Sequence, residues 1–296
     1  MKQIYTPIRN FVFRTIINPI TYNCFTNRLH ILNSIESIEY IIKNKCSISR
    51  YGDGEFSVML GSGNGFQTPN QKLAKALIEV LTSETKNHVN AIPLTLKDLS
   101  NLKDYPEFFW KYYTGRNYWR LKKYLSFDKL YLNAMLTRFY MDYVDKSNCK
   151  KQFELLKSVW QDKDIVIVEG NESRSGIGND LFDNAKSIQR ILGPAKNAFD
   201  KYDEMLNTIK DNVDKDKLIL LSYGMTATVL AYDLAKLGYW AVDLGHLDLE
   251  YEWYLHGAEE KEAVAGKFTN EVQGGNQVAA CTDPKYLSQI IVDITK

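Results

Sequence analysis

Apolar and β-branched residues form four short runs in the second half of the chain, at near-regular spacing. The runs cover residues 164–170, 187–195, 217–224 and 239–245. Runs of this length and composition predict buried strands. Amphipathic stretches lie between most of them, and such alternation is typical of a parallel sheet covered on both faces. The predicted fold class is therefore α/β, a Rossmann-like, mostly parallel sheet with helices on both faces.

The first half carries the same pattern in a less regular form. Residues 33–44 are predicted to form a helix whose cap is Asn33 or Ser34. A second amphipathic helix is predicted over residues 70–83. Its apolar stripe contains Leu73, Leu77 and either Val80 or Leu81. Short strands are predicted at residues 46–52 and 88–94.

Residues 105–124 are rich in Phe, Tyr and Trp. A high density of aromatic residues more often indicates a helix that packs in a hydrophobic core than a surface for ligands. The alternative is a platform on which sugar rings stack. We expect the helical core.

The N-terminal segment, residues 1–32, mixes apolar side chains with Arg9, Arg14 and Arg28. This composition allows a helix that lies in a membrane interface, or a segment that packs on the body of the protein. Pro19 is expected to break any helix through this segment. Contact with a membrane would be peripheral.

Composition narrows the function classes. Of the 296 residues, 37 are Lys or Arg and 36 are Asp or Glu, so the chain lacks the basic excess of a nucleic-acid binder. The four cysteines form no CxxC pair, which is consistent with a reducing cytoplasm and not with a structural zinc site. No apolar run reaches the roughly 20 residues that span a bilayer, and no secretory signal is evident.

Ligands of a parallel α/β sheet bind beyond the carboxyl ends of its strands, so the loops after the predicted strands are the candidate sites. The first is Arg50-Tyr51-Gly52-Asp53-Gly54-Glu55. Asp-Gly is a common turn dipeptide. The alternative is that Asp53 and Glu55 are oxygen ligands for Mg²⁺ or Mn²⁺. We expect both acids at an exposed loop edge.

Two later loops could bind phosphate. Arg174, Gly176 and Asn179 follow the strand at 164–170, and arginine with closely spaced glycines is typical of oxyanion binding. Gly224 and Thr226 lie where a strand turns into a helix, and free N–H groups there attract anions. An ordinary capped helix is the alternative for that second loop.

The loop after the last of the four runs contains His246, Asp248 and Glu250, with Glu252 beyond them. A helix beginning near Asp248 would place Asp248 and Glu252 on one face. Acids in a first helical turn are also normal capping residues. His246 could bind a metal or phosphate, or act as a base. Zinc is not indicated, because there is no H-E-x-x-H motif or Cys/His cluster.

Acids for a hard metal, together with groups for phosphate, suit a nucleotide diphosphate–metal complex. In glycosyl transfer from a nucleotide sugar, negative charge builds on the leaving diphosphate, and a cation held by Asp53 and Glu55 would neutralise it. Asp248, Glu250 or His246 could serve as the base for an acceptor hydroxyl. The remaining predicted donor-binding residues are Arg50, Arg174, Gly176, Asn179, Lys196, Gly224 and Thr226.

Several motifs resemble the GT-D type of glycosyltransferase, a bacterial family first catalogued as a domain of unknown function. They include "RYGDGEF", "TRFYMDYVDKS", "GIGNDLFDNAKSIQRI", "TATVLAYDLAKLGY" and "GHLDLEYEW", in the family's order between about residues 34 and 258. The resemblance implies a UDP-sugar donor and a divalent metal, Mn²⁺ above all, bound through a D-x-E motif that is Asp53-Gly54-Glu55 here. Met225 stands where the family usually has proline.

Residues 33–296 are accordingly expected to form a single glycosyltransferase domain. The predicted reaction moves a hexose from UDP-glucose or UDP-galactose to a lipid-linked or protein-linked glycan acceptor. The setting would be bacterial surface polysaccharide or glycoprotein assembly in the cytoplasm, or at the inner face of the membrane. Two alternatives are a metal-dependent nucleotide-sugar phosphoesterase or hydrolase, and a non-catalytic glycan-binding module. No nucleic-acid partner is expected.

Overall fold

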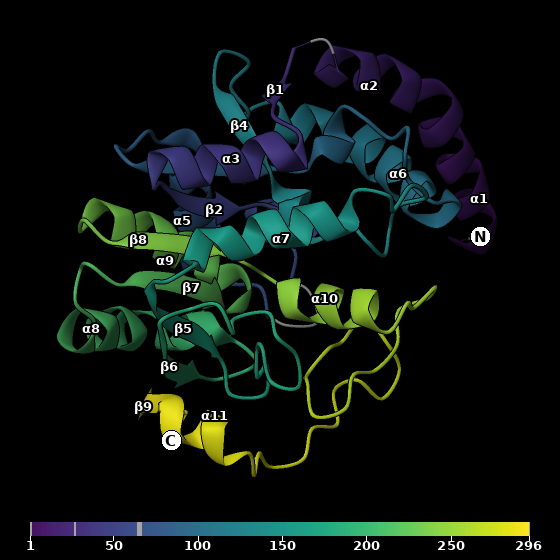
Figure 1. The fold of residues 1–296 in the computed structure, drawn as a ribbon. Helices are drawn as coiled ribbons and strands as arrows, with labels where there is room; N and C mark the ends of the chain where they lie inside the picture. Colours follow the sequence, from purple (N-terminus) through teal and green to yellow (C-terminus); the bar gives the residue numbers. More distant parts are fainter. Residues whose placement is uncertain (1, 27, 64–66, 296) are drawn as a thin grey trace.

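The structure, a computed structural model, describes residues 2–26, 28–63 and 67–295, and in this part of the chain nine strands form one sheet (Figure 1). All the paired strands are parallel, in the order β1-β4-β3-β2-β8-β7-β5-β6-β9. The strands are β1 (His30–Ile31), β2 (Ser47–Arg50), β3 (His88–Ile92), β4 (Leu130–Asn133), β5 (Asp164–Gly170), β6 (Ser187–Gly193), β7 (Leu218–Ser222), β8 (Trp240–Asp243) and β9 (Ile290–Asp293). The predicted parallel α/β fold is confirmed.

Helices cover both faces of this sheet (Figure 1). The α-helices are α1 (Lys2–Val12), α2 (Asn18–Thr26), α3 (Ser34–Asn44), α4 (Asp53–Met59), α5 (Gln71–Thr82), α6 (Asp104–Leu121), α7 (Cys149–Trp160), α8 (Tyr202–Asn212), α9 (Gly224–Lys236), α10 (Leu247–Leu255) and α11 (Pro284–Gln289). Short turns of other helix types are η1 (Phe13–Ile17), η2 (Leu94–Leu96), η3 (Ala134–Thr137) and η4 (Ala198–Lys201). Helices α3 and α7 pack together, as do α5 and α9.

The alternation of side chains along each strand supplies a hydrophobic core on each face of the sheet. In β5, Ile165 and Ile167 pack in the cluster that contains Trp160 of α7. Val166 and Val168 face the opposite cluster, which includes residues of α8 and α9. Because successive side chains of a strand point to opposite faces, a strand covered on both sides is apolar throughout. This is why these strands appear in the sequence as continuous apolar runs.

Two predicted helices have the expected ends and faces. The Asn33 side chain caps α3 by accepting from the Glu36 N–H at 2.9 Å, and the Glu36 carboxylate accepts from the Asn33 N–H at 2.9 Å. This reciprocal pair is a capping box. In α5, the expected stripe is buried: Leu73, Leu77, Val80 and Leu81.

The aromatic region forms α6, and three of its eight aromatic side chains are buried in the core. Trp110, Tyr113 and Tyr118 are buried in a cluster with α5 and other elements. Tyr105 and Trp119 are instead 77% and 65% exposed. The prediction of a helix that packs in the core is confirmed for the buried residues only.

The expected helix break at Pro19 is wrong. Helix α1, the π-helical turn η1 and α2 follow one another without interruption, and η1 ends two residues before Pro19. A proline in a regular helix lacks an N–H donor and clashes with the carbonyl four residues earlier. The wider π turn at this point accommodates it. Within the described residues, no helix is long and apolar enough to cross a membrane.

Candidate active site

A cavity of about 830 Å³ lies across the carboxyl ends of the central strands. Residues that follow β2, β4, β5, β6, β7 and β8 line it, together with the first turns of α6. This is the position at which parallel α/β sheets bind ligands. Its volume is within the range typical of small-molecule sites.

Asp53 and Glu55 line this cavity from the start of α4. The Glu55 carboxylate accepts a hydrogen bond from the Gly52 N–H at 2.7 Å through Oε2. Glu55 is the third residue of α4, and this bond caps the start of the helix. The expectation that Glu55 lies at a loop edge is therefore wrong. Asp53 is exposed and Glu55 is half-buried, so only Asp53 has the predicted exposure.

The acids at this end of the cavity resist ionisation. Desolvation by the surrounding protein raises the pKa of Glu55 to about 7 and raises the pKa of the buried Asp243. It also raises the pKa of Asp53, which is accessible to solvent but lies in the cavity wall. Arg50 opposes the rise at Asp243, with Nη1 lying 3.7 Å from Oδ1. A divalent cation would favour the ionised carboxylates. The cluster is therefore electrostatically suited to a cation.

Two carboxylates are few for a metal site made by protein alone. In the described part of the chain, no group of three or more His, Cys, Asp or Glu residues could hold a metal ion. Mg²⁺ is commonly bound by one or two carboxylates together with substrate phosphates. Asp53 and Glu55 therefore fit a metal ion whose remaining ligands come from a bound phosphate group. They do not fit a metal ion that the protein holds by itself.

The start of α9 forms another part of the cavity wall. Gly224 has a φ of +54° and lies at the beginning of the helix. Thr226, in the first turn, lines the cavity, and its buried hydroxyl has no hydrogen-bond partner in the described part of the protein. Unpaired N–H groups at a helix start, with an unpaired hydroxyl beside them, suit an anionic ligand.

Arg50 also lines the cavity and is held from two sides. Its Nε donates to the Ala134 carbonyl at 2.9 Å. Gly245, with a φ of +54°, packs against the guanidinium, and a Cβ at Gly245 would lie 2.0 Å from Nη1 of Arg50. Only glycine allows this approach. The structure thus places Arg50, Asp53, Glu55, Gly224 and Thr226 together, as the sequence predicts.

Four predicted phosphate ligands are not among the described residues that line the cavity: Arg174, Gly176, Asn179 and Lys196. The Arg174 guanidinium donates to the carbonyls of Gly266, at 2.9 Å, and Ala279. Nζ of Lys196 lies 5.6 Å from the centre of the Phe268 ring. Arg174 therefore holds the segment after α10, and a role for these four residues in donor binding stays a prediction.

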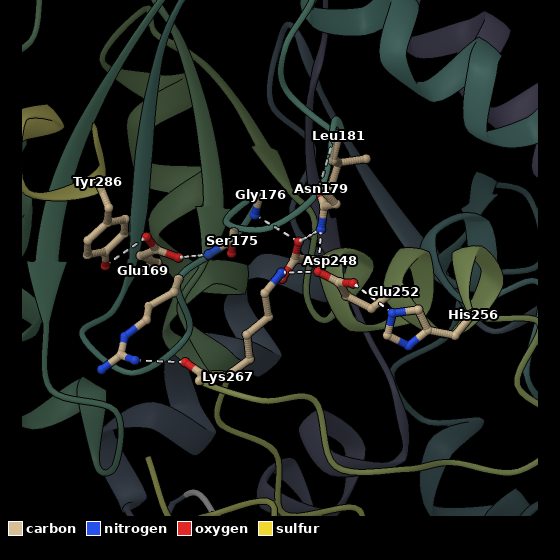
Figure 2. Close-up of polar contacts among 12 residues, drawn as sticks. Glu169, Ser175, Gly176, Asn179, Leu181, Asp248, Glu252, His256, Lys267 and Tyr286 are labelled. Carbon is tan, nitrogen blue, oxygen red and sulfur yellow. Dashed lines mark hydrogen bonds and ion pairs between the residues drawn. The ribbon is translucent and has the colours of Figure 1, made fainter. Parts of the chain in front are cut away.

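Asp248 lines the cavity, yet its carboxylate is engaged in a buried network (Figure 2). Oδ1 accepts from the Gly176 N–H at 2.7 Å and from the Asn179 amide at 2.8 Å. Nζ of Lys267 lies 2.6 Å from both Asp248 and Glu252. The two acids share one face of α10, as expected. Glu169 binds the Ser175 N–H and the Arg190 guanidinium nearby.

Glu250 points elsewhere. It is buried, and its Oε1 accepts from the backbone N–H groups of Tyr140 and Met141 at 2.7 and 2.8 Å. It is absent from the cavity lining within the described residues. Its contacts hold the segment after β4, next to Arg138. Its predicted role as a base is therefore less well supported than that of His246.

His246 lines the cavity at the start of α10, in a group that the sequence did not reveal. Its Nδ1 lies 3.2 Å from Oε1 of Glu271. Glu271 also binds Arg138 through two contacts of 2.6 and 2.8 Å, and Lys261 at 2.9 Å. Burial alone would raise the pKa of Glu271, but Arg138 and His246 together outweigh it and hold that pKa well below the usual range.

Comparison with known proteins agrees with this geometry. The model of the family described as "Glycosyltransferase GT-D fold" matches residues 48–272. The chain belongs to this family. It is 36% identical over 260 residues to glycosyltransferase GlyD of Streptococcus pneumoniae, and 35% identical over 275 residues to a probable glycosyl transferase, Gly, of Streptococcus gordonii. These matches cover 88% and 91% of the chain, but only 32% and 39% of the relatives.

Solved structures share the whole fold. One, described as a highly conserved domain of unknown function with a distinct glycosyltransferase fold, has a TM-score of 0.88 at 36% identity over 93% of this chain and 99% of that one. A glycosyltransferase from Streptococcus sanguinis has a TM-score of 0.85 at 33% identity over 90% of this chain and all of that one. The chain thus spans about a third of its curated relatives' length, which corresponds to one GT-D unit.

Proposed function

We propose that this chain transfers a hexose, glucose or galactose, from its UDP-sugar to a glycan acceptor with the help of Mn²⁺ or Mg²⁺. One observation carries the proposal: a pair of carboxylates and the start of α9, whose Thr226 hydroxyl has no partner among the described residues, lie on the wall of the same cavity. Family membership supports the reaction class. The nucleotide, the sugar and the metal are parts of the proposal.

The donor diphosphate would bind between α9 and α4. The first N–H groups of α9 and the Thr226 hydroxyl supply donors, and Arg50 supplies positive charge on the same wall. Asp53 and Glu55 would hold the metal. When bound with the diphosphate, such a metal neutralises the charge that grows on the leaving group.

The acceptor would approach from the side of His246 and α6. His246 is the predicted base that lines the cavity and is oriented by a carboxylate, Glu271, whereas the Asp248 oxygens are committed to other partners. Tyr105, which lines the cavity and is 77% exposed, offers a ring for a sugar to stack on. The acceptor would be a lipid-linked or protein-linked glycan of bacterial surface polysaccharide or glycoprotein assembly, modified in the cytoplasm.

The test is calorimetric titration of UDP into the protein, with and without Mn²⁺. We expect binding that requires both the metal and Asp53, so that Asp53→Ala loses it. Asp128→Ala is the matched control, since it removes an exposed acid outside the cavity lining. Binding that is indifferent to Mn²⁺ and to Asp53 would refute the metal site.

Turnover distinguishes the proposed transferase from a hydrolase that uses the same acids. UDP-glucose and UDP-galactose are incubated with Mn²⁺, with and without candidate glycan acceptors. We expect UDP release to depend on an acceptor and a new glycan to form. Rapid release of free hexose that no acceptor changes would support the hydrolase instead.

A further inference from the structure

Large apolar side chains lie exposed along the outer side of the N-terminal helices. Ile8, Phe11, Ile16 and Ile20 are between 55 and 64% exposed. Isolated exposed apolar residues are normal on a protein surface, but a contiguous group of them marks a contact site. The arrangement of these four residues therefore decides whether they form such a site.

The π-helical turn brings the four side chains toward one side. In a regular α-helix, residues five apart, such as Phe11 and Ile16, point about 140° away from each other. The turn η1, Phe13–Ile17, lies between them and winds more slowly than an α-helix, so Phe11 and Ile16 point closer to the same side than they would in a regular helix. Ile8 and Ile20 are three and four residues beyond this pair, the spacing of neighbours on one helix face.

Most of the charged side chains around these four residues are basic. Residues 1–35 contain four of the 37 basic residues of the chain and none of its 36 acids. Helix α6 packs against this segment, with the rings of Phe13 and Tyr112 6.3 Å apart and the Arg14 guanidinium 5.2 Å from the Phe108 ring. Residues 108–127 again contain basic residues and no acid. The acids of α6, Asp104 and Glu107, lie in its first turn, where Glu107 pairs with Lys111.

The outward side of α6 and of the turn after it continues the pattern. An exposed stripe at helical spacing there consists of Arg116, Trp119, Arg120 and Lys123. Trp119 is 65% exposed, and Nζ of Lys122 lies 5.3 Å from its ring. Tryptophan flanked by basic side chains is typical of a membrane interface, where the ring sits at headgroup level. Figure 1 shows α1, α2 and α6 together at one end of the molecule, away from α11.

We propose that these two stripes form one lipid-binding face, defined by Ile8, Phe11, Ile16 and Ile20 with Arg116, Trp119, Arg120 and Lys123, and that it docks on an anionic bilayer. Apolar side chains would enter the acyl boundary while the basic side chains bind phosphate headgroups. A second copy of the chain fits less well, because two wholly basic faces repel each other. Docking would also bring α6, whose first turns line the cavity, against the membrane.

The experiment measures co-sedimentation of the full chain with vesicles of phosphatidylcholine alone and of phosphatidylcholine with phosphatidylglycerol. We expect binding to the anionic vesicles and its loss as NaCl is raised. The variant Phe11→Ser/Ile16→Ser/Ile20→Ser should bind roughly a hundredfold more weakly, because it loses three apolar side chains that would enter the bilayer. Arg116→Gln/Arg120→Gln/Lys123→Gln, which removes the three basic side chains of the face, should bind at least about tenfold more weakly.

Val144→Ser is the matched control, since Val144 is 66% exposed but lies outside the lipid-binding face; it should bind as the wild type does. An unchanged unfolding temperature would show that each variant is folded. The wild type staying in solution with anionic vesicles at low salt would overturn the proposal. The proposal would also be overturned if the triple serine variant bound vesicles as tightly as the wild type does. The same holds if the wild type were a dimer that this variant converts to a monomer, because the face would then be a contact between two copies. None of these outcomes depends on UDP binding or transfer.

Discussion

Two pairs of acids lie at the cavity, Asp53 with Glu55 and Asp248 with Glu252, although Glu252 is not among the described residues that line it, and the pairs differ in their partners. Asp248 and Glu252 are closed: Lys267 lies 2.6 Å from each, and Asn179 donates to both (Figure 2). Asp53 and Glu55 are open: among the described residues neither carboxylate forms an ion pair, and desolvation by the surrounding protein raises the pKa of both.

The difference shows how partners assign a role to an acid. A buried carboxylate costs free energy unless a cation and hydrogen bonds compensate it. Lys267 supplies that compensation within the chain, so Asp248 and Glu252 stabilise the fold. No cation within the described part of the chain pairs with Asp53 or Glu55, so a bound ligand would have to compensate their charge. Removing each group should therefore affect activity and stability in opposite proportions.

The largest effect is expected at the open pair. Asp53→Asn should lower metal-dependent transfer by roughly a thousandfold or more, because a group that stabilises the charge of the transition state is lost. The unfolding temperature of the metal-free protein should not fall, since Asp53 is exposed. Steady-state kinetics and thermal unfolding measure the two effects. A variant that keeps full activity would place Asp53 outside the metal site, and one that unfolds would make Asp53 a structural residue.

The closed pair should show the reverse. Lys267→Met should cost about 3–5 kcal/mol of unfolding free energy, because it leaves two buried carboxylates without their cation. Denaturant unfolding measures this cost. Lys186→Met is the matched control: its ion pair with Asp164, at 2.8 Å, lies on the surface, and no measurable change is expected. Equal stability of the two variants would show that the network does not stabilise the fold.

A smaller effect is expected from pH. The pKa of Glu55 is about 7, and a metal binds only the ionised carboxylate, so affinity for Mn²⁺ with UDP should rise about tenfold between pH 6 and pH 8. Titration calorimetry at several pH values measures the rise. Glu55→Gln should bind the metal weakly and lose this dependence. An affinity that is flat across this range would place Glu55 outside the metal site.

The same pKa affects the metal-free fold, with the opposite sign. The pKa of Glu55 is higher in the folded protein than its ordinary value of 4.5, so its stabilising contribution is complete below pH 4.5. That contribution is lost as pH rises through about 7. Glu55→Gln, which retains an oxygen for the Gly52 N–H, should reduce this loss in denaturant unfolding. This measurement is independent of activity.

Local patterns were sufficient for much of the fold. The capped helix at Asn33, the apolar stripe of α5 and the strands β5 to β8 follow from turn chemistry and periodicity, which act over a few residues. The expectation at Pro19 was wrong because a π turn, which no residue pattern announces, accommodates the proline. The GT-D family was identified from its motifs.

The site divides in the same way. Residues directly after strands, such as Asp53 and Thr226, could be placed at the cavity from the chain alone, because the carboxyl ends of parallel strands meet at one edge. The partners of those residues could not. Arg138 and Glu271 are 133 positions apart, and Arg174 reaches the carbonyl of Ala279, 105 positions away. Only folding brings such charges within range of each other, and that proximity decides which acids remain open to a ligand.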